Sequence, residues 1–323
     1  MKILIIGGGG MVGQKLAHSL AKTPLTPNDE VTLFDMTFPD GGAPAKDRVI
    51  GNVTDAAAVQ SLITKRFDLI FHLVAIVSGE AEANFPLGWD VNMQAFRTFL
   101  EALRTEHDAT DGTYRAKVVF TSSIAVFGPP YPDKIPDDFA TNPLTSYGAQ
   151  KAISELMLTD YTRKGNIDGL AIRLPTIVVR PGKANLAASS FFSGIIREPL
   201  NGQVARLPVP DTVRHWHASP RSAAGFLRHA ATLDLEQVGT KRALNVPGVS
   251  CTVAEQIEAL RDVAGNDAVA LIKPEPDDVV MGIVQNWARD FAPEKAIKLG
   301  FTAEKDFASI IQTYIDDDLP KRA

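Results

Sequence analysis

The first 35 residues constrain the fold of this chain more than any other stretch. A short apolar run, Ile3–Ile6, is followed at once by four glycines, and apolar residues then recur at helical spacing from Gln14 to Ala21. This order predicts a buried parallel strand, a tight turn and a helix whose first N–H groups face the turn. The positive end of such a helix is a place where a pyrophosphate binds.

The turn also has the spacing of a dinucleotide site. Gly7, Gly10 and Gly13 form a G-x-x-G-x-x-G pattern, in which glycine permits a tight turn, the approach of a phosphate and close helix–strand packing. A second apolar strand, Glu30–Phe34, ends in Asp35, which lies 22 residues after Gly13. A carboxylate there accepts the adenine-ribose hydroxyls and repels a 2′-phosphate. No arginine follows it directly, so we expect NAD rather than NADP. A flexible glycine loop is the alternative interpretation.

Composition excludes several classes of protein. The net charge of −5 gives no basic footprint, so we expect no nucleic-acid partner. A single cysteine, Cys251, excludes an internal disulfide, and no cluster has metal-ligand spacing, so we predict no metal. No apolar run reaches membrane-spanning length, and the chain starts directly with a core strand, without room for a signal peptide. We therefore expect a cytoplasmic protein without a membrane partner.

Strand and helix patterns alternate along the first half of the chain. This alternation predicts an α/β fold, a Rossmann-type doubly wound parallel sheet. After the strand near residue 172, prolines, loops and short helices dominate. We expect an NAD-binding domain of residues 1–172 and about 212–247. The smaller substrate-binding domain then comprises residues 173–211 and 248–323. Within the first domain, Glu80–Asn84 is expected to be a polar loop.

Tyr147 and Lys151 carry the predicted chemistry. They are four residues apart, which places them on one face of a helix. The ammonium of Lys151 is expected to lower the pKa of Tyr147, so that a phenolate can take the proton of a substrate hydroxyl. Ser123 or Ser122, at the end of the preceding strand, is expected to hold the substrate oxygen. A surface Tyr–Lys pair on an ordinary helix is the alternative, but the order of glycine turn, serines and Tyr–Lys pair favours catalysis.

These motifs together resemble the extended short-chain dehydrogenase/reductases of the NAD-dependent epimerase/dehydratase group, over essentially the whole chain. The resemblance rests on the glycine turn, Asp35, the strand end His72–Ala75, the stretch Ser122–Gly128 and the Tyr–Lys pair. It implies that Tyr147 is the proton acceptor, that Lys151 binds the nicotinamide ribose and that Ser123 is the catalytic hydroxyl. It also implies a homodimer formed by helices near 92–103 and 152–161.

The expected cofactor contacts come from the turn, the strand ends and the catalytic helix. They are Gly7, Gly10, Met11, Val12, Gly13, Asp35, Asn52, Val53, Leu73, Ala75, Asn92, Tyr147, Lys151 and Pro175. For Asn52 and Val53 a plain loop role is an equal alternative. Asn92 is equally well explained as a polar core residue.

Two departures from the family pattern narrow the expected reaction. The sequence Arg173-Leu174-Pro175-Thr176 lacks the asparagine that is usual in sugar-nucleotide epimerases, and Ile124-Ala125 stand where dehydratases carry an acid pair. The chain is most similar to the branch of the family that oxidises the C2 hydroxyl of small sugar acids. That similarity implies D-erythronate as substrate and 2-oxo-tetronate as product. An epimerase that retains NAD, or a non-catalytic dinucleotide sensor, is the alternative.

An acidic substrate needs a cation for its carboxylate. Arginine pairs with a carboxylate through two parallel hydrogen bonds, and Arg180, Arg197 and Arg214 lie in the expected substrate region. We expect substrate contacts from Ser78, Ser123, Tyr147, Thr176, Arg180 and Arg214. Thr176 is expected to donate to a substrate hydroxyl. His215 and His217 are equally well explained as structural or catalytic.

Overall fold

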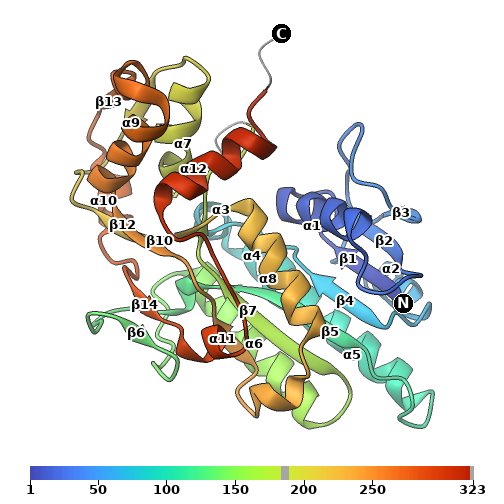
Figure 1. Cartoon of the computed structure of the whole chain (residues 1–323). Coiled ribbons are helices and arrows are strands. Elements are labelled where there is room, and N and C mark those ends of the chain that lie inside the picture. The colour runs from blue at the N-terminus through green and yellow to red at the C-terminus, as the bar shows by residue number, and fades with distance from the viewer. Residues whose placement is uncertain (183–188, 321–323) are drawn as a thin grey trace.

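A central parallel sheet organises the computed structural model, which describes residues 1–182 and 189–320 (Figure 1). Its seven strands follow the order β11-β7-β5-β4-β1-β2-β3. They are β1 (Lys2–Ile6), β2 (Glu30–Asp35), β3 (Asp47–Ile50), β4 (Leu69–His72), β5 (Lys117–Ser123), β7 (Asp168–Leu174) and β11 (Ala243–Asn245). The strand order reverses between β1 and β4, and ligands of open α/β sheets bind in the crevice at such a point. The predicted Rossmann-type sheet is confirmed.

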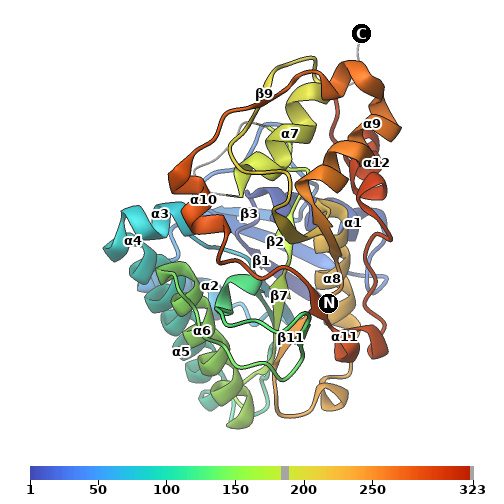
Figure 2. The same ribbon diagram turned by 90° about the vertical axis from the view of Figure 1, so that its left-hand side faces the viewer.

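Helices cover both faces of this sheet because the side chains of a strand alternate between the faces. In β1, Ile3 and Ile5 pack in the cluster that includes α1 and α8, while Leu4 and Ile6 pack in the cluster that includes α2, α5 and α6. Figure 2 shows α1 and α8 on one side, with α5 and α6 on the other. The helices are α1 (Met11–Lys22), α2 (Ala56–Ile63), α5 (Ala95–Asp108), α6 (Ser146–Arg163) and α8 (Pro220–Thr232).

The segment after β4 corrects one prediction. The expected polar loop Glu80–Asn84 is largely helical, because α3 spans Ser78–Ala83 and α4 spans Phe85–Trp89. Alanine and glutamate are good helix formers, and the side chain of Asn84 caps α4 by accepting a hydrogen bond from the backbone N–H of Leu87. A short π-helical turn, Asp90–Gln94, then leads into α5.

A second group of elements has a hydrophobic cluster of its own. Phe192 of α7, Leu260 of α9 and Ile311 of α12 belong to this cluster. Its helices are α7 (Ser190–Leu200), α9 (Val253–Val269), α10 (Asp278–Val284) and α12 (Phe307–Asp317), which lie in the upper part of Figure 1. The short strands here are β8 (Thr176–Ile177), β10 (Arg214–Ala218) and β12 (Val249–Thr252) in one sheet, and β9 (Ala205–Leu207) and β13 (Ile272–Pro274) in another.

The remaining elements link the two groups. The strands β6 (Ile135–Pro136) and β14 (Phe291–Ala292) pair in parallel. Helix α11 (Glu294–Lys298) places Ala296 in the core beneath α1 and α8, although it lies late in the chain. The division into two domains at the expected boundaries stays a prediction. Within residues 1–182 and 189–320, we find no helix with both the length and the apolar character needed to cross a membrane.

Candidate active site

The glycine turn has the shape that a phosphate requires. Gly7 has φ of +89°, which favours glycine, and a Cβ at Gly13 would overlap the carbonyl oxygen of Gly7. Both glycines are therefore needed by the fold itself. Gly10 is exposed, and the nearest protein atom to a Cβ there would lie 3.5 Å away. Since the protein does not fill the space beside Gly10, a phosphate can approach the backbone closely at this position. Met11 and Val12 follow in the first turn of α1.

Asp35 lies at the end of β2, beside this turn. Its Oδ2 accepts a hydrogen bond from the N–H of Gly9 at 2.9 Å, and its Oδ1 accepts one from the N–H of Met36 at 2.7 Å. These bonds hold the carboxylate next to the glycine turn. This position agrees with the expected role of Asp35 at the adenine ribose of NAD.

Gln14 contributes to this region and was not predicted from the sequence. Its amide Nε2 donates to the carbonyl of Gly8 at 2.5 Å, and its Oε1 accepts from the N–H of Ala43 at 2.7 Å. The side chain thus ties the glycine turn to the loop after β2. The only signal in the sequence is its place directly after the last glycine, in the first turn of the helix.

The other expected cofactor residues lie at the carboxyl ends of the strands or close to them. Leu73 and Ala75 follow β4 and are half-buried, and Pro175 follows β7. Beyond β3, Asn52 is exposed and accepts from the N–H of Thr54, whereas Val53 is buried. Ser78 begins α3 and is half-buried.

Asn92 has the geometry of a polar core residue. Its Oδ1 accepts from the N–H of Ile76 at 2.7 Å, and its Nδ2 donates to the carbonyl of Ile76 and to Oε1 of Gln150. Both amide hydrogens are therefore used within the protein. The side chain fixes the segment after β4 against α6, so it shapes the crevice rather than facing a ligand.

Tyr147 and Lys151 lie on the face of α6 that packs on the end of β5. The Ser123 side chain lies near enough to the Tyr147 hydroxyl to lower the pKa of the phenol, and Lys151 Nζ donates to the carbonyl of Thr121 at 2.8 Å. Lys151 is almost completely buried, and its Nζ lies 4.6 Å from the centroid of the Phe120 ring. The structure therefore brings together the predicted hydroxyl, base and ammonium.

Ser122 and Ser123 both contact α6, but at different residues. Ser122 is buried, and its partner lies two helical turns beyond Tyr147. The Ser122 hydroxyl instead donates to Glu155 Oε1 at 2.5 Å, within the protein. Glu155 also forms two hydrogen bonds with Arg173, at 2.9 and 2.7 Å. The expectation that Ser122 shares the catalytic role is corrected on this geometry, which leaves Ser123 alone.

The predicted source of the low pKa of Tyr147 is also corrected. Burial raises the pKa of Tyr147 to about 12, and the effects that oppose this rise are the hydrogen bond to Ser123 and the positive charge of Arg180. Lys151 is not among these effects, and burial lowers its own pKa to about 7. The cation that acts on the phenol is Arg180.

Arg180 lies in a half-buried, cationic environment. Its Nε donates to the carbonyl of Ile177 and its Nη2 donates to the hydroxyl of Ser189. Burial, and then the nearby charge of Arg197, lower the pKa of Arg180 to about 10. Arg197 itself donates to the carbonyl of Arg180 at 2.9 Å. An anion bound here would offset both causes, so this environment favours a carboxylate.

Thr176 lies next to the same region but has a different role from the one expected. The Nδ1 of His215 lies 2.9 Å from the carbonyl oxygen of Ala288, which can only accept, so Nδ1 carries the hydrogen. Burial lowers the pKa of His215 to about 4, and Nε2 of the neutral ring is an acceptor. The hydroxyl of Thr176, at 2.7 Å, therefore donates to His215 and is left to accept from a ligand.

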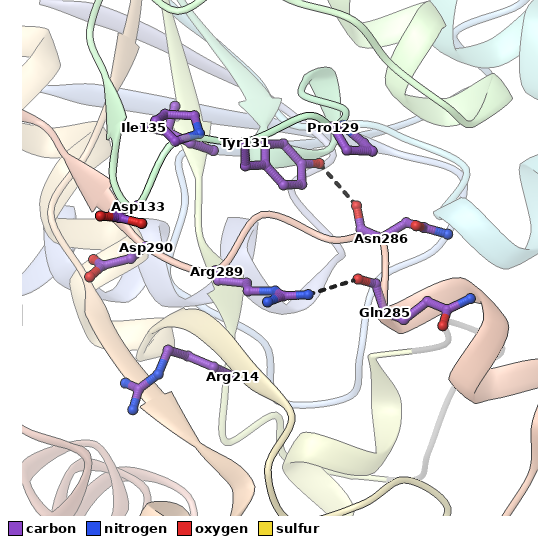
Figure 3. Close-up of a pocket in the computed structure, with 10 residues that line it drawn as sticks. Pro129, Tyr131, Asp133, Ile135, Arg214, Gln285, Asn286, Arg289 and Asp290 are labelled. Carbon is purple, nitrogen blue, oxygen red and sulfur yellow. Dashed lines mark hydrogen bonds between the residues drawn. The ribbon is translucent and has the colours of Figure 1, made fainter.

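Arg214 belongs to a separate pocket of about 430 Å³ (Figure 3). The pocket is lined by Pro129, Tyr131, Pro132, Asp133, Ile135, Arg214, Gln285, Asn286, Arg289 and Asp290. Ser123, Tyr147 and Lys151 do not line it. Arg214 forms an ion pair with Glu255 at 3.1 Å and remains 38% exposed. Arg180, which was expected to share the substrate with Arg214, does not line this pocket.

Comparison with known proteins agrees with these motifs. Residues 3–237 match the model of the NAD dependent epimerase/dehydratase family. The chain is 43% identical to a D-erythronate dehydrogenase of Cupriavidus necator, over 98% of each chain. It is 38% identical to a D-erythronate dehydrogenase of Haemophilus influenzae, over 99% of this chain and all of the other.

A solved structure shares the whole architecture. It is described as a nucleoside-diphosphate-sugar epimerase from Agrobacterium tumefaciens, with 53% sequence identity and a TM-score of 0.93. The alignment covers 99% of this chain and 94% of that one. The family match, the glycine turn and the Tyr147–Lys151 pair together lead to one conclusion: the chain is an enzyme of the NAD dependent epimerase/dehydratase family, and NAD is its cofactor.

Proposed function

We propose that this enzyme is an NAD-dependent dehydrogenase that oxidises the C2 hydroxyl of a small sugar acid, with D-erythronate as substrate and 2-oxo-tetronate as product. The two relatives named D-erythronate dehydrogenase, each aligned over nearly the full chain, support this choice. The departures from the epimerase and dehydratase patterns at Thr176 and at Ile124-Ala125 agree with it.

The observation that carries the proposal is the place of Arg180 beside Tyr147. In a 2-hydroxy acid the carboxylate is attached to the carbon that bears the reacting hydroxyl. A cation that holds this carboxylate must therefore lie next to the base that takes the hydroxyl proton. Arg180 meets this requirement, whereas Arg214 lines a pocket without Tyr147. Among the arginines considered, Arg180 is the one we assign to the carboxylate.

The proposed reaction moves one proton and one hydride. Ser123 and Tyr147 hold the C2 hydroxyl, the phenolate of Tyr147 takes its proton, and the C2–H electron pair leaves as hydride while the C=O bond forms. NAD, when bound, accepts that hydride. Lys151 holds the nicotinamide ribose, and Arg180 aligns the substrate through its carboxylate. Thr176 accepts a hydrogen bond from a further substrate hydroxyl.

A sugar-nucleotide epimerase is the second candidate, because the solved structure with 53% identity is described as one. Such an enzyme oxidises and then re-reduces its substrate, so it retains its cofactor and releases no net NADH. The absence of an asparagine at position 176 disfavours this candidate.

The two candidates are separated by following NADH absorbance with NAD and a panel of C4 to C6 aldonic and uronic acids plus L-threonine. We expect NADH to form with D-erythronate. NADH from a different acid would keep the mechanism and change the substrate. Cofactor that co-purifies with the protein, with no NADH from any acid, would contradict the dehydrogenase and favour the epimerase.

We also propose that two copies associate through α5 and α6. Leu156 of α6 is 72% exposed, which is unusual for a large apolar side chain in the middle of a helix. The two helices lie together on one outer face of the molecule (Figure 2). A second copy that packs its own α5 and α6 here would bury this side chain.

A further inference from the structure

Helix α6 is attached to β5 at three successive positions of the strand. Thr121 accepts from Lys151 through its carbonyl, Ser122 donates to Glu155, and Ser123 lies near enough to Tyr147 to lower its pKa. Tyr147, Lys151 and Glu155 follow one another at intervals of four residues, so they lie along one face of the helix. Two of these attachments involve the proposed catalytic pair, and the third involves Glu155, which has no part in the mechanism so far.

Glu155 is a buried carboxylate in a complete hydrogen-bonded network. Its side chain is 6% exposed and its Oε2 lies 2.7 Å from Nη2 of Arg173. Arg173 donates in turn to Oδ1 of Asn245 at 3.2 Å and lies over the ring of Phe127. Removing one partner of such a buried pair would leave the other charge unpaired, which is strongly unfavourable. Glu155 and Arg173 therefore hold each other in place.

The charges around Lys151 show what this network does for the catalytic pair. Lys151 lies one helical turn before Glu155 and one turn after Tyr147 on α6. From the sheet, His72 of β4 faces it, and burial lowers the pKa of this imidazole to about 3, so the ring is neutral. Arg180 acts on Tyr147. Glu155 is the charged group that raises the pKa of Lys151, against the larger effect of burial.

We propose that Glu155 is a positioning residue for the catalytic pair, because its hydrogen bonds to Ser122 and Arg173 fix α6 on the sheet and place a negative charge one helical turn from Lys151. The inference deepens the proposed function, since the ammonium of Lys151 is the group proposed to hold the nicotinamide ribose. Ser122 and Arg173 act through Glu155, by holding its carboxylate in place.

The inference is tested without turnover, in cofactor-free protein, by a cycle of unfolding measurements. Lys151→Met removes the buried ammonium from the wild-type protein and from Glu155→Gln, and urea midpoints are compared at pH 6 and pH 10.5. With Glu155 neutralised, burying the ammonium is costlier, so Lys151→Met should raise the midpoint more in Glu155→Gln than in wild type at pH 6. The extra rise should disappear at pH 10.5, because the buried Lys151 is then neutral in the folded protein, whether or not Glu155 carries a charge. Equal rises at pH 6 would overturn the inference.

Two further variants keep the test decisive. Ser122→Ala retains the Glu155–Arg173 pair and should give the wild-type response to Lys151→Met. If Glu155→Gln fails to fold, the double variant Glu155→Met with Arg173→Met replaces the pair by apolar side chains and serves as the background instead. The same extra rise is expected there, and its absence would count against the inference.

A functional readout separates this inference from the proposed reaction. Glu155→Gln should weaken NAD binding by about tenfold, which corresponds to about 1.4 kcal/mol. Glu155→Asp, which restores the charge, should recover most of that affinity. Unchanged NAD affinity in Glu155→Gln would contradict the inference even if wild-type protein oxidises D-erythronate. Failure of that oxidation with an intact unfolding cycle would contradict only the proposed function.

Discussion

The catalytic group around Tyr147 and the pocket around Arg214 use arginine in opposite ways. Arg180 is half-buried beside Tyr147 and Arg197, where its own pKa is lowered. Arg214 is 38% exposed, and its charge is paired with Glu255. Both arginines come from the same stretch of sequence and were expected to share one role. The comparison teaches that burial and charged neighbours, rather than residue type, set the electrostatic environment of each arginine.

Replacing each arginine by methionine tests the difference between Arg180 and Arg214 most directly. We expect Arg180→Met to lower kcat/KM for the acid substrate roughly 100-fold, because losing one partner of a buried charge pair costs about 2–5 kcal/mol. Arg214→Met should change it less than about threefold, since exposed ion pairs contribute about 0–1 kcal/mol. Steady-state kinetics with D-erythronate measure both. The reverse ranking would assign the carboxylate to the Arg214 pocket.

The buried ammonium of Lys151 allows a prediction about stability and pH. Its pKa is about 7 in the folded protein, below the unfolded value of about 10.4, so burial of the charged form destabilises the fold. This cost is fully present below pH 7 and disappears as the pH rises to 10.4. Lys151→Met should therefore raise the free energy of unfolding by up to about 4 kcal/mol at pH 7 or below. Urea unfolding with a pH-independent gain would refute this account.

The two neighbouring serines of β5 give a matched pair. Ser123→Ala should lower kcat about 100-fold, which is typical of losing one donor to a developing oxyanion. Ser122→Ala should leave kcat within a few-fold and lower the free energy of unfolding by about 1 kcal/mol, the contribution of one hydrogen bond. If Ser122→Ala is as inactive as Ser123→Ala while remaining folded, the assignment of the catalytic hydroxyl to Ser123 alone is wrong.

The smallest effect on activity is expected from the outer face of α6. Leu156→Asp places a charge where an apolar side chain is 72% exposed. We expect sedimentation to show loss of the dimer, with kcat/KM retained to within a few-fold, because the opposite face of α6 carries the catalytic pair. If the wild-type protein is already a monomer, the proposal that two copies associate through α5 and α6 is wrong.

The cofactor half was predictable because local patterns determine it. The glycine spacing, the strand that ends in Asp35 and the four-residue separation of Tyr147 and Lys151 each follow from backbone periodicity. The roles of Thr176 and Ser122 did not follow, since each depends on a distant partner, His215 or Glu155. The ranking of Arg180 and Arg214 depends on burial, which one sequence does not show.

The role of Glu155 could be predicted from the sequence only in part. Its position, eight residues after Tyr147 and four after Lys151, predicts that it shares their helix face. Its partner Arg173 lies on another strand, so the network became visible only with the fold. The expected effect of Lys151 on Tyr147 failed for a related reason. Spacing places the two residues together, but burial of both side chains sets their pKa values.

The proposed role of Tyr147 is the central claim, and one comparison tests it most directly. NADH formation from D-erythronate is measured for the wild-type protein and for Tyr147→Phe, together with NAD binding to both. We predict steady NADH formation by the wild type, and a loss of at least about 1,000-fold in Tyr147→Phe with NAD affinity unchanged. Turnover by Tyr147→Phe near the wild-type rate would contradict the account, because the reaction would then not need the hydroxyl of Tyr147 as its base.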